Sequence, residues 1–254
     1  MNLRLPDHLG ANYRSSSQRA RIVTENWTAT SAFCPLCQQG LAQAAANTPA
    51  LDFYCPACAL TFELKSKKGR FGHSIVDGAY SVIIKQITSN AHPNLLLLGY
   101  TTDGWVTDFS LVPKRFFVPA LIEKRKPLSL TARRTGWVGC NLRIGAIPAD
   151  GRIYYVRDGA VNEKEAVTSQ WIKTAFLDQV DVDSRAWLVS VMACVQSLNQ
   201  RTFALEQVYQ LVPKLQEQYP NNRHIRAKIR QQLQVLRDKG WLTFRGRGVY
   251  SLNV

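Results

Sequence analysis

The chain has 254 residues, of which 46% are hydrophobic and 20% are charged, so it can bury a core and has the composition of a globular protein. Lys and Arg number 32 against 18 Asp and Glu, and the resulting net charge of +14 favours a polyanionic partner. The sequence has no apolar run near the roughly 20 residues of a membrane span, and its N-terminus lacks an apolar signal core. We therefore expect a bacterial cytoplasmic protein with no membrane partner.

The positive charge is clustered, which distinguishes this chain from proteins that merely carry solvated lysines. Residues 221–254 contain eight Lys or Arg and one acid, Asp238. Two further basic clusters lie within residues 65–70 and 124–134. Clusters of this kind indicate nucleic acid as the partner.

The first predicted element is a helix over residues 18–27, which follows three capping serines at 15–17. Two strands are expected next, over residues 51–54 and 60–66, one on each side of a cysteine pair. The chain is therefore expected to begin with one helix and two short strands.

Four of the six cysteines form the pattern C-x2-C-x17-C-x2-C, with Cys34 and Cys37 in one pair and Cys55 and Cys58 in the other. Two such pairs are typical of a structural zinc site with tetrahedral thiolates. Disulfides are the alternative, but nothing in the sequence indicates a secretory context. We predict a zinc module over residues 34–58, because the segment between the pairs is too small and polar to pack alone.

Asp52, Glu63 and Lys65 form the pattern D-x10-E-x-K, which runs through this module. The two-residue period of a strand places Glu63 and Lys65 on one face. Two carboxylates supply the hard oxygens that Mg²⁺ prefers, and the Leu64 carbonyl is the expected third protein ligand. Lys65 can orient the attacking water. A strand acid near a lysine is more often a solvated ion pair, but the basic surroundings favour Mg²⁺-dependent cleavage of a phosphodiester.

The rest of the first ~180 residues alternates between helices and strands, which indicates an α/β domain. A buried strand is expected at 94–101, where Leu95 to Leu98 form a short apolar run. Residues 80–88 fit either a strand or a helix, and we favour a helix because Asp77 and Gly78 precede it. The other expected elements are a strand at 107–112, a helix at 116–123 and a strand at 152–156.

A segment over residues 131–141 combines arginines, glycines and one tryptophan. A loop tryptophan is more often buried because of its large area. Beside Arg133 and Arg134, however, Trp137 could instead contact DNA. Both interpretations stay open on the residues alone.

The composition changes at residues 180–184, and we place a domain boundary there, with one domain over 1–180 and another over 181–254. The second domain has three helical patterns, over 184–198, from Phe203 to a break near Pro213, and over 223–239. A hairpin that turns at 245–248 follows. Three helices and a basic hairpin match a winged helix.

The third of these helices has the composition of a DNA-recognition helix, because arginine can read guanine and glutamine can read adenine. Arg230 and Gln231 lie opposite its apolar stripe, and Arg226 and Lys228 flank that face. Arg245 and Arg247 in the hairpin are expected to contact phosphate or the minor groove. A solvated helix is the alternative, which the scarcity of acidic partners disfavours.

Several segments of the chain closely resemble the DpnI family of methyl-directed restriction endonucleases, from about Ser17 to the C-terminus. They are SQRARIVTENW, CPLC, DFYCPAC, FELKSKKGRF, DGAY, KPLSLTARRTGWVGCN, GRIYYVRDG and IRQQLQVLRDKG. The chain departs from the broader nuclease pattern at Leu51, where that pattern has proline, and from the family over residues 38–50 and 181–218. These departures concern flanking-sequence preference and affinity for DNA.

The resemblance implies a PD-(D/E)XK nuclease fold with Asp52, Glu63 and Lys65 as the catalytic set, and a winged helix as the second domain. It implies four zinc-bound cysteines and a substrate of double-stranded DNA with N6-methyladenine in GATC. It also implies that Trp137 senses the adenine methyl groups. We expect a monomer that uses Mg²⁺ for catalysis and Zn²⁺ for structure.

Two other functions compete with a methyl-directed nuclease. A transcriptional regulator would bind DNA through the zinc module and the winged helix without cutting it, but would not need the Asp52, Glu63 and Lys65 trio. A structure-specific repair nuclease would cut branches or nicks regardless of methylation.

Overall fold

The computed structural model describes residues 1–45, 48 and 50–253; residues 46, 47 and 49 of the predicted zinc module and the terminal residue 254 lie outside the described residues. The chain divides into two compact units. The first contains Met1–Ile75, Ala91–Lys114 and Asp150–Ile172, and the second contains Val76–Asn90, Arg115–Ala149 and Lys173–Val254. Within the described residues, the helices are all too short or too polar to cross a membrane.

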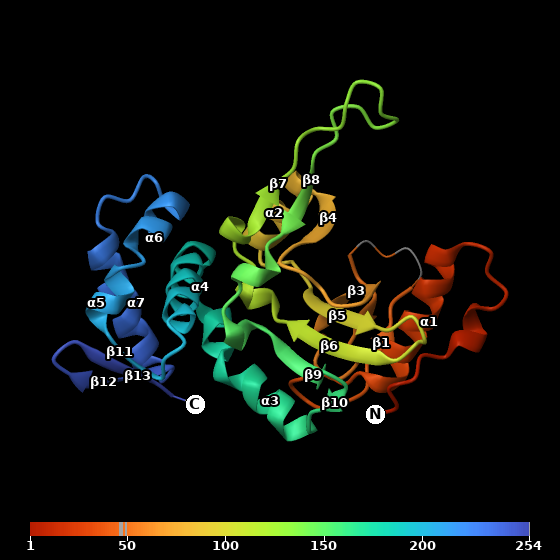
Figure 1. Cartoon of the computed structure of the whole chain (residues 1–254), viewed down its shortest axis with the longest axis horizontal. Helices are drawn as coiled ribbons and strands as arrows, with labels where there is room; N and C mark the ends of the chain where they lie inside the picture. The colour runs from red at the N-terminus through yellow and green to blue at the C-terminus, as the bar shows by residue number, and fades with distance from the viewer. Residues whose placement is uncertain (46–47, 49, 254) are drawn as a thin grey trace. The chain divides into compact units, whose positions relative to one another are not determined.

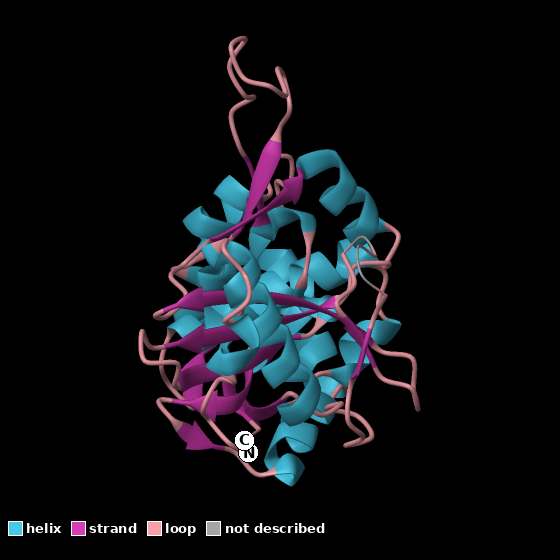
Figure 2. Cartoon of the chain, turned by 90° about the vertical axis from the view of Figure 1, so that its right-hand side faces the viewer, coloured by secondary structure: helices cyan, strands magenta, loops and turns pink. Residues whose placement is uncertain are grey.

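The first unit is built on a seven-stranded sheet with the order β1-β2-β3-β5-β6-β9-β10 (Figures 1 and 2). The long strands β5 and β6 lie near its centre, and short strands close both edges. The strands are β1 (Ala42–Gln43), β2 (Phe53–Tyr54), β3 (Thr61–Lys68), β5 (Asn94–Tyr100), β6 (Val106–Val112), β9 (Ile153–Arg157) and β10 (Ala160–Val161). The helices of this unit are α1 (Ser16–Ser31) and α3 (Lys164–Lys173).

Pairing in the sheet is antiparallel except between β3 and β5, which run parallel. β5 is buried at each of its seven residues, in agreement with its run of four leucines; the buried Asn94 at its start donates to the Thr61 carbonyl. β3 is less buried: Phe62 is fully buried, Glu63 to Ser66 are partly exposed, and Lys67 and Lys68 are exposed. The sheet therefore carries polar side chains near its β1–β3 edge.

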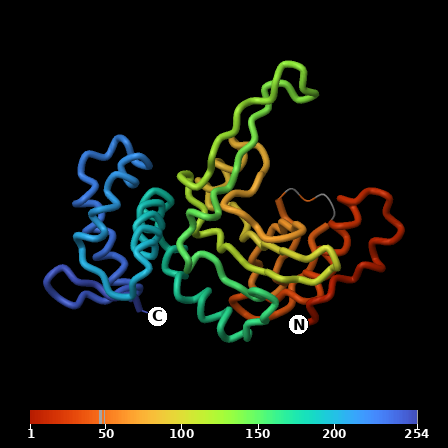
Figure 3. The backbone as a smooth tube through the Cα atoms, viewed as in Figure 1, coloured from red at the N-terminus to blue at the C-terminus, as the bar shows by residue number. Residues whose placement is uncertain are grey.

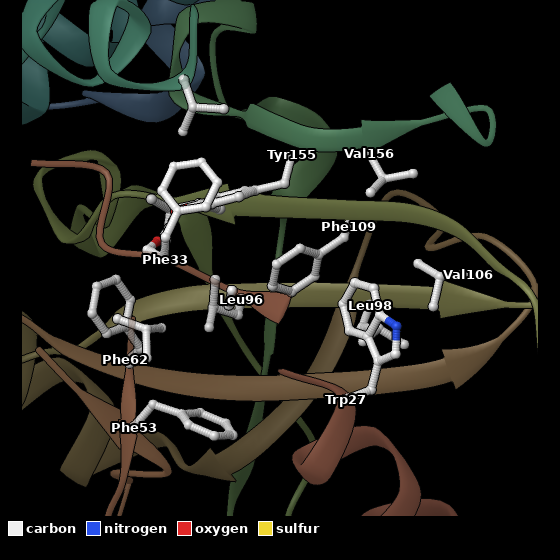
Figure 4. Close-up of a cluster of buried hydrophobic side chains, with 14 of the residues drawn as sticks. Trp27, Phe33, Phe53, Phe62, Leu96, Leu98, Val106, Phe109, Tyr155 and Val156 are labelled. Atoms are coloured by element: carbon white, nitrogen blue, oxygen red, sulfur yellow. Dashed lines mark hydrogen bonds between the residues drawn. The ribbon is translucent and has the colours of Figure 1, made fainter. Parts of the chain in front are cut away.

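The core of this unit gathers aromatic side chains from α1, from α3 and from five strands of the sheet. Figure 4 shows part of this cluster. Trp27 of α1 meets Phe109 of β6 edge-on, with ring centroids 5.2 Å apart. Tyr155 of β9 packs on Phe33 and donates its hydroxyl to the Phe33 carbonyl at 2.8 Å. These contacts fix α1 and the chain that follows it against the sheet.

The second unit contains two three-stranded sheets with the orders β4-β8-β7 and β11-β13-β12. The first is made of β4 (Ile75–Ala79), β7 (Ile122–Lys124) and β8 (Gly139–Leu142), beside α2 (Tyr80–Thr88). The second is made of β11 (Thr202–Ala204), β12 (Leu242–Gly246) and β13 (Val249–Leu252). Four further helices belong to this unit: α4 (Val182–Ser197), α5 (Leu205–Tyr209), α6 (Val212–Gln218) and α7 (Ile225–Asp238).

The C-terminal part of this unit confirms the first and third predicted helices, as α4 and α7, and the hairpin that follows them. Asp181 caps the N-terminus of α4, since its carboxylate accepts the Ser184 N–H at 2.9 Å. α7 buries Ile225, Ile229, Leu233 and Leu236 on one side, as the sequence predicted.

Two predictions about local structure were wrong. Residues 116–123 do not form a helix: a short 3-10 turn at Pro119–Leu121 leads into β7. The helix predicted from Phe203 is two helices, since Phe203 lies in β11 opposite Tyr250, and Pro213 stands in the first turn of α6. Proline is tolerated there because the first N–H groups of a helix have no intrahelical partner.

Candidate active site and metal centre

Asp52 and Glu63 come from neighbouring positions of a β-hairpin. β2 and β3 pair antiparallel with Phe53 opposite Phe62, and both rings are fully buried. The Asp52 Oδ2 accepts the Leu64 N–H at 2.7 Å, and the Asp52 N–H donates to the Phe62 carbonyl at 3.0 Å. Because Phe62 and Leu64 flank Glu63, the backbone of β3 holds Asp52 beside Glu63.

Lys65 is the third member of this group and lies two residues after Glu63 on the same strand. Its Nζ is 2.6 Å from Glu63 Oε1, and the two side chains are 25% and 13% exposed. Phe62 and Leu64, which alternate with them, pack in or against the hydrophobic core. The structure therefore brings Asp52, Glu63 and Lys65 together on a hairpin that the core fixes from behind.

The oxygen donors of this hairpin suit a hard divalent cation. Asp52 and Glu63 supply carboxylates, and the Leu64 backbone lies directly against Asp52. Mg²⁺ prefers oxygen ligands of this kind and binds through one or two carboxylates. The Lys65 ammonium beside them offers positive charge where a phosphodiester would be attacked.

The four predicted zinc ligands also meet. The Sγ atoms of Cys34, Cys37, Cys55 and Cys58 all lie within 4.8 Å of one another, and all four thiols are free. The Cys34–Cys58 and Cys37–Cys55 separations are both 3.4 Å, and Cys37–Cys58 is 4.0 Å. A tetrahedral zinc with bonds of about 2.3 Å requires sulfur separations of about 3.8 Å. The cluster could therefore hold zinc.

The two cysteine pairs lie in matching turns. In the first, the Cys34 N–H donates to the Gln39 carbonyl and the Gln38 N–H returns to the Cys34 carbonyl. The second repeats this with Cys55, Leu60 and Ala59. Gln38 and Ala59, the fifth residue of each turn, both have positive φ angles, 62° and 57°. This repetition presents two thiols from each turn to one centre.

The thiols of the cluster differ in acidity. Burial strongly raises the pKa of Cys34 above its ordinary value. Burial also acts to raise the pKa of Cys55, but the Cys58 backbone N–H and the Cys37 thiol outweigh it and lower this pKa to about 7. A thiolate at Cys55 is therefore accessible near neutral pH, which favours capture of a metal ion.

The metal centre and the acidic group belong to one hairpin. Cys55 and Cys58 lie in the connection between β2 and β3, directly between Asp52 and Glu63 in the sequence. The other turn follows the end of α1 at Ser31. A zinc ion held by all four thiols would thus tie the hairpin to the chain leaving α1.

The predicted DNA-reading residues of α7 have unequal surroundings. Gln231 is exposed, whereas Lys228 is half-buried with its Nζ 5.8 Å from the centre of the Trp187 ring. Arg226 and Arg230 both lie over Tyr209, at 5.1 and 5.8 Å, and the Arg230 Nε donates to the Tyr209 hydroxyl at 2.5 Å. Tyr209 therefore orients both arginines, and the sequence pattern did not indicate this contact.

The hairpin after α7 turns at the predicted position. Gly246 pairs with Val249, and the two residues between them, Arg247 and Gly248, have φ angles of 49° and 75°. Two consecutive positive φ angles are characteristic of a type I′ turn. Arg245 and Arg247 are both exposed, so the turn presents two cations to solvent.

Residues 125–138 form a long loop between β7 and β8 (Figure 3). Arg133 and Arg134 are exposed, and the Arg134 guanidinium lies 5.7 Å from the centre of the Trp137 ring. Trp137 is half-buried, and a Cβ added at Gly139 would come within 2.7 Å of its indole. The indole therefore packs closely on the Gly139 backbone and keeps part of its surface open.

A cavity of about 890 Å³ lies beside Asp52. Arg21 and Glu25 of α1 and Gln43 of β1 also line it. No motif in the sequence gives these three residues a role in the site. The four-residue spacing of Arg21 and Glu25 on a helix was a signal for an ion pair, but it could not show that a cavity lies next to it.

The comparisons with known proteins agree with this arrangement. A protein-family model described as DpnI, Dam-replacing family, matches residues 1–180. A second model, described as the Dam-replacing HTH domain, matches residues 183–252. Together they confirm the expected fold class, in which a nuclease core with a four-cysteine cluster precedes a C-terminal helix-turn-helix domain.

Proposed function

This chain belongs to the DpnI (Dam-replacing) family of restriction endonucleases, and we propose that it cleaves double-stranded DNA at GATC sites that carry N6-methyladenine. The observation that supports the chemistry most is the hairpin that holds Asp52 and Glu63 side by side with Lys65. The reaction is Mg²⁺-dependent hydrolysis of the phosphodiester, and the enzyme is a type II, methyl-directed deoxyribonuclease of the bacterial cytoplasm.

The three residues divide the work of hydrolysis. Asp52, Glu63 and the Leu64 carbonyl would hold the Mg²⁺, which when bound would lower the pKa of water and screen the charge that develops on phosphorus. Lys65 orients the attacking water and stabilises the transition state through its ammonium. The Leu64 N–H orients Asp52 from behind, since it donates to Oδ2 at 2.7 Å.

The zinc in this proposal is structural. Four thiolates complete its coordination, so no position remains for water or substrate. Its part is to hold the connection between β2 and β3, and thereby the spacing of Asp52 and Glu63.

Two regions supply the contacts to DNA. We propose that residues 1–180 form the nuclease domain and 181–254 the winged-helix domain, and that the protein acts as a monomer. In the second domain, Arg226, Lys228, Arg230 and Gln231 of α7 contact the DNA, and Arg245 and Arg247 contact phosphates. The exposure of Gln231 and of both hairpin arginines supports this assignment.

The loop at 125–138 supplies the methyl reader. Arg133 and Arg134 contact the DNA backbone, and the open part of the Trp137 indole contacts the adenine methyl groups. Contact between a methyl group and an aromatic surface releases water from both. Discrimination on the order of 1–3 kcal/mol per methyl group follows by analogy with one added methylene in a pocket.

Digestion of plasmid DNA tests the proposal. The same plasmid, prepared with and without adenine methylation at GATC, is incubated with the full chain and Mg²⁺. We expect fragments from the methylated form only. Intact methylated plasmid would favour a DNA-binding regulator, and equal cutting of both forms would favour a repair nuclease.

A further inference from the structure

We propose that Arg21 binds a backbone phosphate of the DNA next to the phosphate that is cleaved, and that Glu25 and Gln43 position it for this contact. The proposal rests on the proposed function and adds a contact to the same site. Three observations support it. Hydrogen bonds connect Arg21 to Asp52, the Glu25 carboxylate that binds Arg21 is buried, and the guanidinium has N–H groups that are available to a ligand.

Arg21 is connected to the catalytic hairpin through a short series of hydrogen bonds. Its Nε donates to Glu25 Oε1 at 2.6 Å, and Gln43 Nε2 donates to Glu25 Oε2 at 2.9 Å. Gln43 belongs to β1, and the next residue, Ala44, donates its N–H to the Asp52 carbonyl at 2.8 Å. A helix, an edge strand and the hairpin thus hold Arg21 in a fixed relation to Asp52.

The anchor of Arg21 is a buried carboxylate. The Glu25 side chain is 10% exposed, whereas that of Arg21 is 55% exposed. An ordinary helix pair at this spacing has both partners in solvent and contributes little to stability. Glu25 is instead desolvated and satisfied by partners on two different elements, which is the arrangement of a positioning group.

The guanidinium has donors left for a ligand. Arginine carries five N–H groups, and among the described residues the one hydrogen bond of Arg21 uses Nε. Both Nη groups therefore remain for a bidentate contact, which suits a phosphate better than a lysine ammonium would. They lie on the wall of the cavity that also contains Asp52, Tyr13 and Gln18.

The charges in this cavity explain why such a contact is needed. Asp52 and Glu25 contribute two negative charges, and Arg21 contributes one positive charge. The pKa of Arg21 is raised mainly by Glu25 and to a smaller extent by the Coulomb interaction with Asp52. The charges of Arg21 and Asp52 are therefore close enough to interact. A DNA strand that reaches Asp52 meets carboxylates, and Arg21 offsets their repulsion at the neighbouring phosphate.

The test uses binding as well as cleavage. Methylated GATC duplexes are prepared in which one phosphate at a time, on each side of the cut, is replaced by a neutral methylphosphonate. Affinity is measured for the full chain and for Arg21→Ala with Ca²⁺ in place of Mg²⁺. At one substituted position we expect the wild-type chain to bind about tenfold more weakly than it binds the unmodified duplex, which is the effect of one charged hydrogen bond. Arg21→Ala should bind this substituted duplex and the unmodified duplex equally well. Equal losses at every position in both proteins would overturn the proposal.

Three further variants separate the contact from folding. Glu25→Gln keeps the size of the side chain but weakens its interaction with Arg21. The position-specific loss of affinity should therefore be smaller in Glu25→Gln than in the wild-type chain. Arg21→Lys keeps the charge and covers the case in which Arg21→Ala does not fold; it should retain the effect only in part. Arg157→Ala removes an exposed arginine elsewhere in the first unit and should keep the wild-type pattern.

The outcomes also distinguish this proposal from the proposed function. A wild-type chain that does not cut DNA, yet shows a methylphosphonate effect that Arg21→Ala abolishes, would refute the nuclease and keep the phosphate site. If the wild-type chain cuts methylated DNA, but methylphosphonate substitution lowers the affinity of the wild-type chain and of Arg21→Ala equally, the phosphate site is refuted and the nuclease is not.

Discussion

The hairpin of β2 and β3 and the loop at residues 125–138 are both proposed to face DNA, but they are held in different ways. In the hairpin, core aromatic rings, ladder hydrogen bonds and a four-thiol cluster fix the side chains. In the loop, most residues are exposed, and short-range contacts such as the Leu128 N–H with the Trp137 carbonyl hold it together. Chemistry requires preorganised groups, whereas a reader of DNA can complete its shape on contact.

Removal of a catalytic group from the hairpin should have the largest effect. We expect Asp52→Ala or Lys65→Ala to slow cleavage of methylated DNA on the order of 10³-fold or more, because each group acts on the charge of the transition state. Binding of the uncut duplex should change little. Single-turnover cleavage and a binding assay measure the two quantities.

Lys67→Ala is the matched control, since Lys67 lies one period further along the same face of β3 and is exposed. It should cut at a rate close to that of the wild-type chain. An equal loss in Lys65→Ala and Lys67→Ala would mean that the lysines only attract DNA.

Loss of the metal centre should come next, because it acts on the hairpin indirectly. A Cys37→Ser variant, or treatment with a zinc-selective chelator, should remove bound zinc, lower the Tm by at least about 10 °C and reduce cleavage strongly. Cys140→Ser tests the specificity of the effect, since Cys140 is buried outside the cluster. Full Mg²⁺-dependent cleavage without zinc would show that the cluster does not brace the active site.

In the loop, we expect Trp137→Ala to change preference more than rate. The ratio of cleavage rates on methylated and unmethylated duplexes should fall by about tenfold, within the range expected for one lost methyl contact. Gly139→Ala is a milder test, because its new Cβ would displace the indole without removing it. It should lower the ratio less than Trp137→Ala; an unchanged ratio in both would make Trp137 a structural residue.

The smallest effect should come from the wing. Arg247→Gly relieves the positive φ angle at this position, so the fold should tolerate it. It should weaken binding to all sequences alike and reduce the slope of log affinity against log salt by about 1, as for one phosphate contact. A change in sequence preference with an unchanged slope would instead place Arg247 at a base edge.

Features with a regular period or a fixed spacing were the ones that the sequence predicted well. The C-x2-C pairs, the alternation of Phe62 with Glu63 and the apolar stripe of α7 follow from local geometry, and the structure confirms each of them. The joining of Asp52 to the Leu64 N–H could not be predicted, because it depends on how β2 pairs with β3.

The wrong predictions also concern segments whose structure depends on residues far away in the sequence. Phe203 has a helical pattern but becomes a strand because β13 is available beside it. The segment 116–123 is apolar enough for a helix, yet Ile122 pairs with Leu142 in β8. The spacing of Arg21 and Glu25 indicates an ion pair, but nothing in the sequence shows that Glu25 also accepts a hydrogen bond from Gln43 on β1.

The central claim is that the Asp52, Glu63 and Lys65 hairpin cuts methylated DNA with Mg²⁺. The most direct measurement is a single-turnover digestion of one GATC duplex, methylated or unmethylated, by the wild-type chain and by Lys65→Ala. The account predicts Mg²⁺-dependent cleavage of the methylated duplex by the wild-type chain, and binding without cleavage by the variant. Equal cleavage by both proteins, or none by the wild-type chain, would contradict it.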